Sequence, residues 1–305
     1  MRHESDLDPV LAGLFDGFDS ADATWDLTQL RPGLDRFAAA VSHRRPCRVV
    51  TDDVVAGVPV RRYRHQPPSD QPPDHQQGQP GLQLVWAHGG GWIAGSLAAI
   101  DPVCRALAVL SGAEVVSVGY RLAPENPFPA GLDDVRAVVA ALLASSDLDK
   151  VAVGGDSAGA GLAAVVAQEQ PALVAQVLLN PMLDATLSSA SVQALATGYG
   201  LTRTGLARFI ELYAGDPVDP KVSPLLAPAL TGLPPLVVVT AGLDPLHDDG
   251  VAYAQRCRKA GVPVAHRCWE SMVHGFVGMS AITPAADEAL GWTVASLEQL
   301  RRRAA

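Results

Sequence analysis

The sequence predicts an α/β protein built around a mostly parallel sheet, and three observations lead to this fold class. From residue 82 to the end of the chain, short apolar runs alternate with longer amphipathic segments. Several of these runs are unbroken stretches of Val and Leu, as in strands that helices cover on both faces. The length of 305 residues, with 48% hydrophobic and 18% charged residues, suits one large α/β core.

The N-terminal elements precede this alternation. Apolar residues at three- and four-residue spacing predict two amphipathic helices, within 7–18 and 27–41. Two β-branched runs, at 48–55 and 58–63, predict a hairpin. The segment 65–80, with five prolines and five glutamines, is expected to form a polar loop.

Strands and helices then follow one another in order. Strands are expected at 82–87, 114–118, 151–154, 174–179, 236–240 and 262–269. Helices are expected at 97–110, 132–143, 158–168, 247–259 and 287–303. The segment between 179 and 236 is too long for one crossover, and it holds a further amphipathic helix around Leu206.

This long segment and the N-terminal helices indicate how the chain is divided. Residues 1–45 and 185–220 are expected to share apolar faces and to form a helical cap above the carboxyl edge of the sheet. Residues 46–184 and 221–305 are expected to form the core. An apolar pocket would then lie between the cap and the core.

Composition excludes several functions. A net charge of −9, with no basic cluster longer than residues 301–303, argues against nucleic acid as a partner. Two charge-free runs, 76–100 and 222–243, are long enough to span a bilayer, but glycines or prolines interrupt both, so no membrane span is expected. The four scattered cysteines indicate neither a zinc site nor disulfides, and they fit a cytoplasmic protein.

The strongest functional signal is Gly-Asp-Ser-Ala-Gly at 155–159. It follows a predicted strand and precedes a predicted helix, which is the setting of a nucleophilic serine on a sharp turn. Gly155 and Gly159 are needed because larger side chains would clash across that turn. Ser157 is therefore the candidate nucleophile, and the alternative is a glycine-rich turn with an idle serine. The overlapping Gly-x-Gly-x-x-Ala at 159–164 resembles a dinucleotide fingerprint, but it begins inside the helix, so no cofactor is expected.

A second motif, His-Gly-Gly-Gly-Trp at 88–92, directly follows a predicted strand. Consecutive glycines let backbone N–H groups approach a substrate oxygen. The N–H groups of Gly89, Gly90 and Ala158 are predicted to form an oxyanion hole, and His88 is expected to anchor the loop. The alternative is a flexible loop without such a role.

A serine hydroxyl needs an imidazole to accept its proton, and that imidazole needs a carboxylate to hold its tautomer. Asp244 lies after the strand predicted at 236–240, and His274 lies after the last strand. Both are therefore expected at the carboxyl edge of the sheet, beside Ser157. His247 and the two aspartates that follow it compete for these roles, but they are predicted to lie on the next helix.

The predicted cap and the loop after residue 87 are expected to supply the walls of the pocket. The candidate substrate-binding residues are Trp92, Phe15, Phe18, Tyr199, Phe209, Ile210 and Tyr213. All are aromatic or aliphatic, so they favour an apolar ligand. No cluster of metal-binding residues is recognised, and no metal is expected.

These motifs, together with Tyr-Arg-Leu-Ala-Pro-Glu at 120–125 and Pro-Phe-Pro-Ala at 127–130, resemble the hormone-sensitive lipase-like family of α/β-hydrolases. The resemblance implies an eight-stranded, mostly parallel sheet flanked by helices, with an α-helical cap and no cofactor. It implies a carboxylesterase that hydrolyses short- to medium-chain acyl esters through Ser157, Asp244 and His274. It leaves open a homodimer through the edge strand.

Two other functions stay open. A serine hydrolase or acyltransferase that acts on an amide, a lactone or a specialised ester would use the same residues. A homologue that binds a small molecule without catalysis would keep the pocket but typically lacks the histidine, and His274 is present here. The departure from the family pattern at Trp92, where Phe or Tyr is more common, would narrow the acyl pocket.

Overall fold

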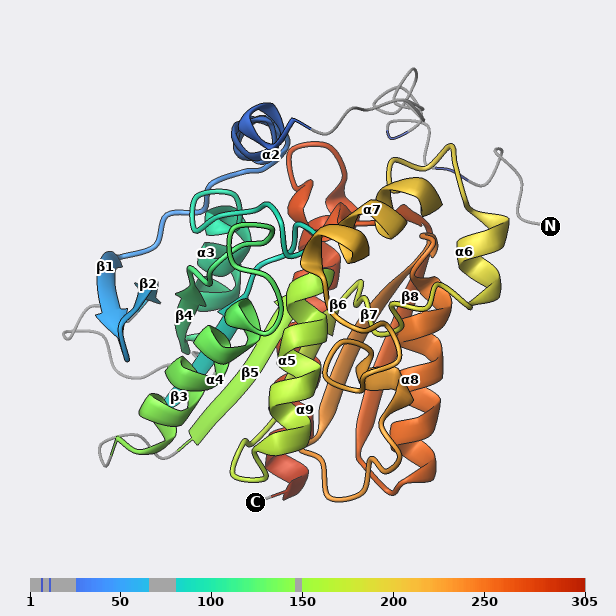
Figure 1. Cartoon of the computed structure of the whole chain (residues 1–305). Coiled ribbons are helices and arrows are strands. Elements are labelled where there is room, and N and C mark those ends of the chain that lie inside the picture. The colour runs from blue at the N-terminus through green and yellow to red at the C-terminus, as the bar shows by residue number, and fades with distance from the viewer. Residues whose placement is uncertain (1–6, 8–10, 12–25, 66–80, 146–149, 305) are drawn as a thin grey trace.

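The computed structural model describes residues 7, 11, 26–65, 81–145 and 150–304. One eight-stranded sheet runs through the molecule in the order β1-β2-β4-β3-β5-β6-β7-β8 (Figure 1). The strands are β1 (Val49–Val55), β2 (Val58–Arg64), β3 (Leu82–Ala87), β4 (Glu114–Val118), β5 (Lys150–Asp156), β6 (Gln176–Leu179), β7 (Leu236–Leu243) and β8 (Val264–Val273). Strand β2 pairs antiparallel with β1 and β4, and the other neighbouring pairs are parallel. The predicted fold class is confirmed.

Helices cover both faces of the sheet. They are α2 (Leu27–Val41), α3 (Asp101–Ser111), α4 (Ala130–Leu143), α5 (Ala158–Glu169), α6 (Ala190–Ala194), α7 (Arg203–Tyr213), α8 (His247–Lys259) and α9 (Pro284–Ala304), with short 3-10 turns η2 (Pro224–Leu226) and η3 (Phe276–Gly278). Helices α4, α5 and α8 pack on one face, and α3 and α9 pack on the other (Figure 1). Helices α3, α4, α5 and α8 each connect two strands that run parallel in the sheet.

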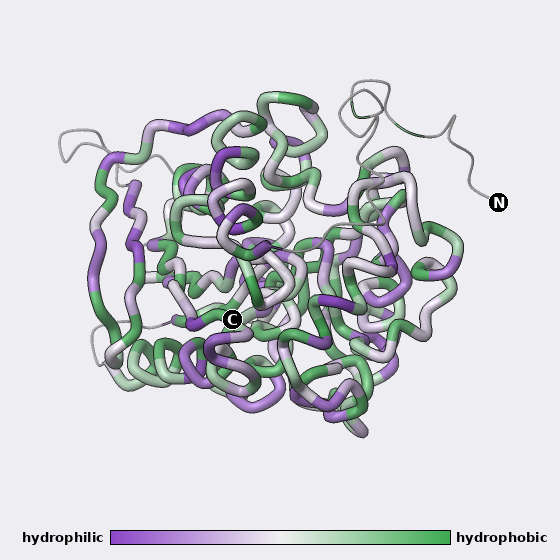
Figure 2. The backbone as a smooth tube through the Cα atoms, turned by 45° about the horizontal axis from the view of Figure 1, so that its top comes forward, coloured by the Kyte–Doolittle hydropathy of each residue, from purple (hydrophilic) through white to green (hydrophobic). Residues whose placement is uncertain are grey.

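The sheet separates two apolar clusters, because alternate side chains of a strand point to opposite faces. In β3, Val85 packs with α4 and α5, whereas Leu84 and Trp86 pack with α3 and α9. Each fully buried aliphatic side chain of this kind contributes about 1.5–3 kcal/mol to the stability of the folded state. The edge of the sheet differs from this apolar interior, because the hairpin of β1 and β2 carries hydrophilic stretches along its length (Figure 2).

Several element boundaries differ from the sequence predictions. Helix α3 begins at Asp101, four residues after its predicted start at 97, because Pro102 favours the first helical turn and residues 97–100 form turns instead. Helix α6 is only five residues long and was missed, since so short a segment carries no periodic signal. The helix predicted within 7–18 and the loop predicted at 65–80 lie outside the described residues, except for Leu7, Leu11 and His65.

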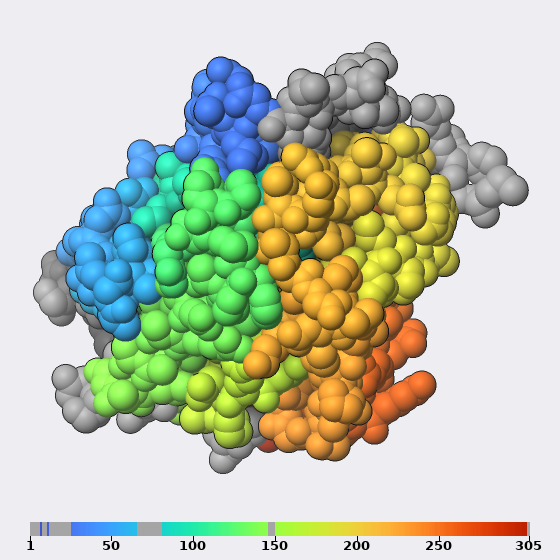
Figure 3. Space-filling model, in the orientation of Figure 1, coloured from blue at the N-terminus to red at the C-terminus, as the bar shows by residue number. Residues whose placement is uncertain are grey.

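The carboxyl ends of β3, β5, β6 and β7 meet at one edge of the sheet, and α2 and α7 lie over this end of the molecule (Figure 1). In the space-filling view the blue α2 and the gold segment around α7 form the upper end of the molecule (Figure 3). Helices α2 and α7, which belong to the two segments expected in the cap, therefore occupy one end of the molecule. Their division from the core as a cap stays a prediction.

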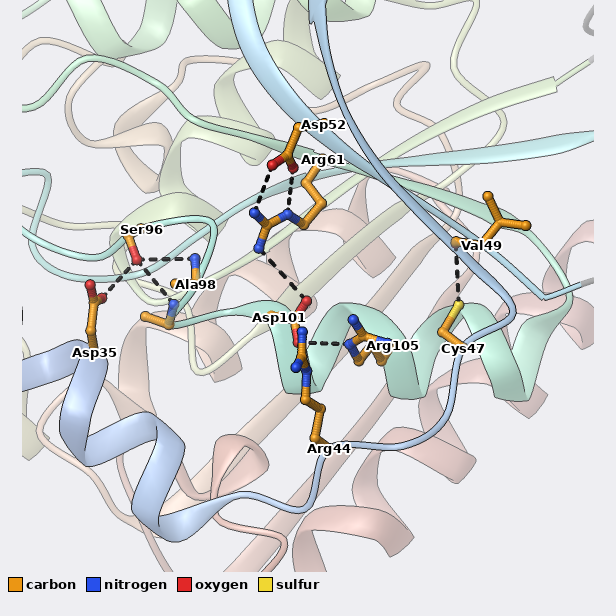
Figure 4. A network of polar contacts seen from close by, with 11 residues as sticks. Asp35, Arg44, Cys47, Val49, Asp52, Arg61, Ser96, Ala98, Asp101 and Arg105 are labelled. Carbon is orange, nitrogen blue, oxygen red and sulfur yellow. Dashed lines mark hydrogen bonds and ion pairs between the residues drawn. The ribbon is translucent and has the colours of Figure 1, made fainter.

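Helix α2 is tied to the loop that follows β3. Arg31 donates to the carbonyl oxygens of Ile93 at 2.8 Å and Ala123 at 3.0 Å, and it forms an ion pair with Glu125 at 2.6 Å. The Asp35 carboxylate accepts from the Ser96 hydroxyl at 2.7 Å (Figure 4). These contacts fix the helix against that loop.

A second set of charges joins the segment after α2 to α3 (Figure 4). The buried carboxylate of Asp101 accepts from Arg105 at 2.7 Å and from Arg44 at 2.8 Å, and Arg61 lies 3.9 Å away. Arg61 also pairs with Asp52 at 2.6 Å, on the exposed side. The side chain of Asp101 is 6% exposed, whereas that of Asp52 is 67% exposed.

Replacing Asp101 by Asn should lower the free energy of unfolding by about 3 kcal/mol, because the buried guanidinium of Arg105 would lose its carboxylate partner. The matched change Asp52→Asn removes an exposed partner and should cost less than about 1 kcal/mol. Urea unfolding followed by circular dichroism compares the two. Equal losses in both variants would contradict the importance given to burial.

Candidate active site

Ser157 lies on a sharp turn between β5 and α5. Its backbone angles, φ 54 and ψ −123, fall in a region that residues other than glycine avoid, at a cost of about 1–3 kcal/mol. Neighbouring backbone groups hold the turn in place. The Ser157 N–H donates to the carbonyl of Leu179 at 2.9 Å, and the Ser157 carbonyl accepts from Met182 at 3.1 Å.

The two glycines of the motif are required on steric grounds. A Cβ atom at Gly155 would lie 2.6 Å from the Ala87 carbonyl oxygen, and one at Gly159 would lie 2.2 Å from the same oxygen. Both distances are shorter than any real contact of a Cβ atom with backbone. Strand β3 and helix α5 therefore approach closely enough to raise the serine above the sheet only because these positions lack side chains.

The structure brings Ser157, His274 and Asp244 together. The His274 Nε2 lies 2.9 Å from the Ser157 Oγ, and the His274 Nδ1 lies 2.9 Å from the Asp244 Oδ2. Asp244 follows β7 and is buried, and His274 follows β8. The backbone N–H of Leu246 donates to the other Asp244 oxygen at 2.8 Å, and the Asn180 side chain donates to Oδ2 at 3.2 Å. The imidazole thus contacts the hydroxyl on one side and a fixed carboxylate on the other.

The charges near His274 raise its pKa. Burial of the ring lowers the pKa, but the charge of Asp244 and its hydrogen bond outweigh that effect, and the charge of Asp156 adds to them. The pKa of His274 therefore lies above its ordinary value of 6.5. An imidazole of this kind is a stronger proton acceptor than a free one.

His88 has a structural position. It is buried, its ring stacks on Tyr120 at 4.2 Å, and its Nδ1 lies 2.8 Å from the Gly89 carbonyl oxygen. The Tyr120 hydroxyl donates to the His88 carbonyl at 2.7 Å. Burial lowers the pKa of His88 to about 4, so the ring is neutral at neutral pH. These contacts agree with its predicted role as an anchor of the glycine loop.

The structure contradicts the expectation that Gly89 is a free donor. Its N–H donates to the Asp156 Oδ2 at 3.0 Å, and the Trp86 indole donates to the other oxygen of this carboxylate at 3.1 Å. Burial raises the pKa of Asp156 to about 6, although both hydrogen bonds and the charge of His274 oppose this. The sequence reasoning overlooked that the acidic residue before Ser157 would compete for the first N–H of the loop.

Three backbone donors at the site remain without an acceptor among the described residues: the N–H groups of Gly90, Gly91 and Ala158. Gly90 and Ala158 are among the donors that the sequence predicted for an oxyanion hole, and Gly91 is not. The third glycine of the run was the available signal, since Gly91 has φ +61, which favours glycine. These three N–H groups can donate hydrogen bonds to a negatively charged oxygen next to the Ser157 hydroxyl.

A cavity of about 310 Å³ opens onto Ser157 and His274. Its walls are mostly apolar and come from α2, the start of α3, α7 and the segment around η3. The α2 residues at 34, 37, 38 and 41 follow helical spacing and share one face, so they line the cavity together. Sequence reasoning had recognised this face as apolar but did not assign it to the pocket.

Among the seven predicted wall residues, Phe209 lines the cavity. The expectation is not met for Trp92 and Tyr213, whose buried rings stack on each other at 4.3 Å, or for Ile210, because these three side chains pack into the core. Tyr199 packs against the other apolar cluster, beyond the residues that line the cavity. The remaining two candidates, Phe15 and Phe18, lie outside the described residues.

The competing residues lie on α8, as predicted. Asp249 is buried and accepts from the backbone N–H groups of Leu183 and Asp184, both at 3.0 Å. Burial raises the pKa of Asp249 to about 7. This carboxylate holds the backbone of the segment after β6. Among the residues with described positions, no group of three or more His, Cys, Asp or Glu could hold a metal ion.

A family model of the α/β-hydrolase fold matches residues 84–278. Ethyl acetate hydrolase of Pseudomonas putida is 39% identical over 79% of this chain and 78% of its own length. The chain therefore belongs to the α/β-hydrolase family. Carboxylesterase NlhH of Mycobacterium tuberculosis is 38% identical over 96% of both chains. The solved structure of a hormone-sensitive lipase from a metagenome library is 31% identical with a TM-score of 0.83, over 94% of this chain and 97% of that one. The resemblance drawn from the motifs is confirmed.

Within the part of the chain that the structure describes, no helix is long and apolar enough to cross a membrane. The edge strand through which a homodimer was left open is β8, which runs from Val264 to Val273 and pairs with β7 on one side.

Proposed function

We propose that the protein is a carboxylesterase that hydrolyses small, uncharged esters with short- to medium-chain acyl groups. The observation that carries this proposal is the line of contacts from Asp244 through His274 to Ser157, beside three N–H groups that have no acceptor in the described part of the chain. Membership of the α/β-hydrolase family, together with relatives named ethyl acetate hydrolase and carboxylesterase, supports ester hydrolysis.

In the first half of the reaction, the Ser157 Oγ attacks the ester carbonyl carbon while the His274 Nε2 accepts its proton. The carbonyl oxygen becomes negative and receives hydrogen bonds from the N–H groups of Gly90, Gly91 and Ala158. Asp244 holds the Nδ1–H of His274 and stabilises the positive ring. The intermediate then collapses, the bond to the alcohol oxygen breaks, and His274 protonates the leaving alcohol.

In the second half, water enters the place of the alcohol. His274 accepts a proton from the water as its oxygen attacks the acyl carbon, and the same three N–H groups stabilise the second intermediate. Its collapse breaks the bond to the Ser157 Oγ, which regains a proton from His274. The carboxylic acid leaves, and the enzyme returns to its starting state. Each well-placed N–H donor supplies about 3 kcal/mol of transition-state stabilisation.

The cavity supports the choice of substrate. The side chains of Leu34, Phe37 and Phe209, with Met279, give it an apolar wall, and its volume of about 310 Å³ suits a small ester. A Cβ atom at Gly91 would lie 2.4 Å from the Phe209 ring, so this ring covers the oxyanion loop directly. In this proposal α2 and the segment 185–220 act as a cap that encloses the acyl chain.

Replacing Ser157 by Ala should reduce kcat/KM for p-nitrophenyl butyrate at least about a thousand-fold, because the nucleophile is removed. Fluorophosphonate labelling should disappear in the same variant. The control Ser145→Ala changes an exposed serine and should keep both activity and labelling. Wild-type turnover in Ser157→Ala would disprove the proposed function.

The raised pKa of His274 predicts the acid limb of the pH profile. A protonated imidazole cannot accept the Ser157 proton, so kcat/KM should fall as the pH drops through a midpoint above 6.5. Ester hydrolysis by the wild-type protein, measured between about pH 5 and pH 9, determines this midpoint. A midpoint below 6.5 would mean that burial has a larger effect than Asp244 on the pKa of His274.

Replacing Phe209 by Ala should lengthen the acyl group that the pocket accepts, because the ring forms one wall of the cavity. The ratio of kcat/KM for p-nitrophenyl octanoate to that for the butyrate should rise about ten-fold. Leu212→Ala, a change on the same helix at a residue that packs on the core, should leave this ratio unchanged. An unchanged ratio in Phe209→Ala would exclude this wall as the limit on chain length.

A further inference from the structure

Asn180 is a buried polar residue beside the candidate triad that the reaction described above does not use. It directly follows β6 and is only 1% exposed, and it lines the cavity that opens onto Ser157. In the sheet, β6 lies between β5, which leads to Ser157, and β7, which leads to Asp244. We propose that Asn180 is a positioning residue that orients the Asp244 carboxylate toward His274 and moderates the basicity of the imidazole. This proposal rests on the proposed function.

The contacts of Asp244 define which end of the Asn180 amide faces it. A carboxylate can only accept hydrogen bonds, so the Nδ2 group, 3.2 Å from Asp244 Oδ2, must be the donor. The same oxygen lies 2.9 Å from the His274 Nδ1. The amide and the imidazole therefore share one carboxylate oxygen, while the Leu246 N–H holds the other. Without Asn180, the carboxylate would lose one of the three donors that fix its rotation.

The backbone of Asn180 holds the side chain in a fixed direction. Its φ is 44, in the left-handed region that Asn tolerates better than other residues with a Cβ atom. Its N–H donates to the Val239 carbonyl on β7 at 2.9 Å. The preceding carbonyl, that of Leu179, accepts from the Ser157 N–H at 2.9 Å. Residues 179 and 180 thus link the strand of the nucleophile to the strand of the acid.

The Oδ1 atom of Asn180 is buried and has no hydrogen-bond partner among the described residues. A buried amide with one end unpaired is unfavourable for folding, and such groups are rare in native proteins. The left-handed backbone adds to this cost. Both features are understandable if the donor end of the amide serves Asp244.

The electrostatic effect of Asn180 is opposite to that of the acidic groups around it. Asp244 and Asp156 are the charged groups that act on the His274 ring, and both favour its protonated form. Behind Asp244, the buried Asp249 of α8 interacts with it and with Asp184. The neutral amide draws negative charge from the Oδ2 atom that faces the ring. Asn180 should therefore keep His274 unprotonated to a lower pH than Asp244 alone would allow.

The test uses Asn180→Gly and Asn180→Asp in the full-length protein. Glycine removes the donor but still accepts the left-handed backbone, so a loss in this variant reports the side chain. We expect kcat to fall about ten- to a hundred-fold with KM nearly unchanged. The acid limb of kcat/KM should move upward by about half a pH unit or more, and further in Asn180→Asp, which adds a negative charge of similar shape.

Gln176→Leu provides the matched control. This buried amide lies at the other end of β6 and donates to the Pro234 carbonyl, so its loss should lower the melting temperature without moving the acid limb. If Asn180→Gly does not fold, Asn180→Asp and the downfield proton resonance of the His274–Asp244 hydrogen bond provide the same comparison. That resonance should shift in Asn180→Asp and stay unchanged in Gln176→Leu.

Acid limbs at the wild-type position in both Asn180 variants, with an unchanged resonance, would overturn the proposal even if kcat falls, since a purely structural role gives that result. Failure of the proposed function is distinguishable from this. It would appear as a wild-type protein that hydrolyses no ester, or as Ser157→Ala with full activity, whereas failure of the Asn180 proposal leaves wild-type hydrolysis and its loss in Ser157→Ala intact.

Discussion

The turn at Ser157 holds a backbone conformation that residues with a Cβ atom avoid, and much of the surrounding structure offsets that strain. Its N–H and carbonyl are both hydrogen-bonded to the segment 179–182, so the turn cannot relax without breaking the end of β6. Because Gly155 and Gly159 have no side chains, the backbone of β3 can lie in contact with the backbone of the turn. Because β3 continues directly into the glycine loop, Gly90 and Gly91 line the same cavity as Ser157.

Three aspartates lie around the candidate site, and their partners give them different roles. Asp244 contacts the imidazole, Asp156 accepts from the first N–H of the glycine loop and from an indole, and Asp249 holds the backbone after β6. Burial raises the pKa of Asp156 to about 6 and that of Asp249 to about 7. Of the three, only Asp244 contacts a histidine nitrogen and can therefore hold the tautomer of the ring. The residue type, which is aspartate in each case, does not distinguish these roles.

The sequence was sufficient for the sheet and for the meeting of Ser157, Asp244 and His274, because parallel strands end at one edge and each residue follows such a strand. The sequence did not reveal that the Gly89 N–H, a predicted oxyanion donor, donates to the Asp156 carboxylate instead. It also failed for most of the pocket walls. Helical spacing reveals which residues share a face, but it does not tell whether that face, as at Ile210, contacts a cavity or the core.

The contacts of α2 connect one wall of the cavity with the segment that follows the glycine loop. Arg31 and Asp35 bind the segment that continues from the glycine loop, and residues 34, 37, 38 and 41 of the same helix line the cavity. A displacement of α2 would therefore break the charge-assisted contacts at Ile93 and Glu125 and disturb the loop that carries Gly90 and Gly91. The Gly90 carbonyl accepts hydrogen bonds from the N–H groups of Ile93 and Ala94, three and four residues further along the chain, so the loop and the helix contacts share one backbone segment. The α2 wall of the cavity and the glycine loop are thus joined by one set of contacts. In the proposed reaction, the fit of the acyl chain against α2 would therefore affect the alignment of the N–H donors.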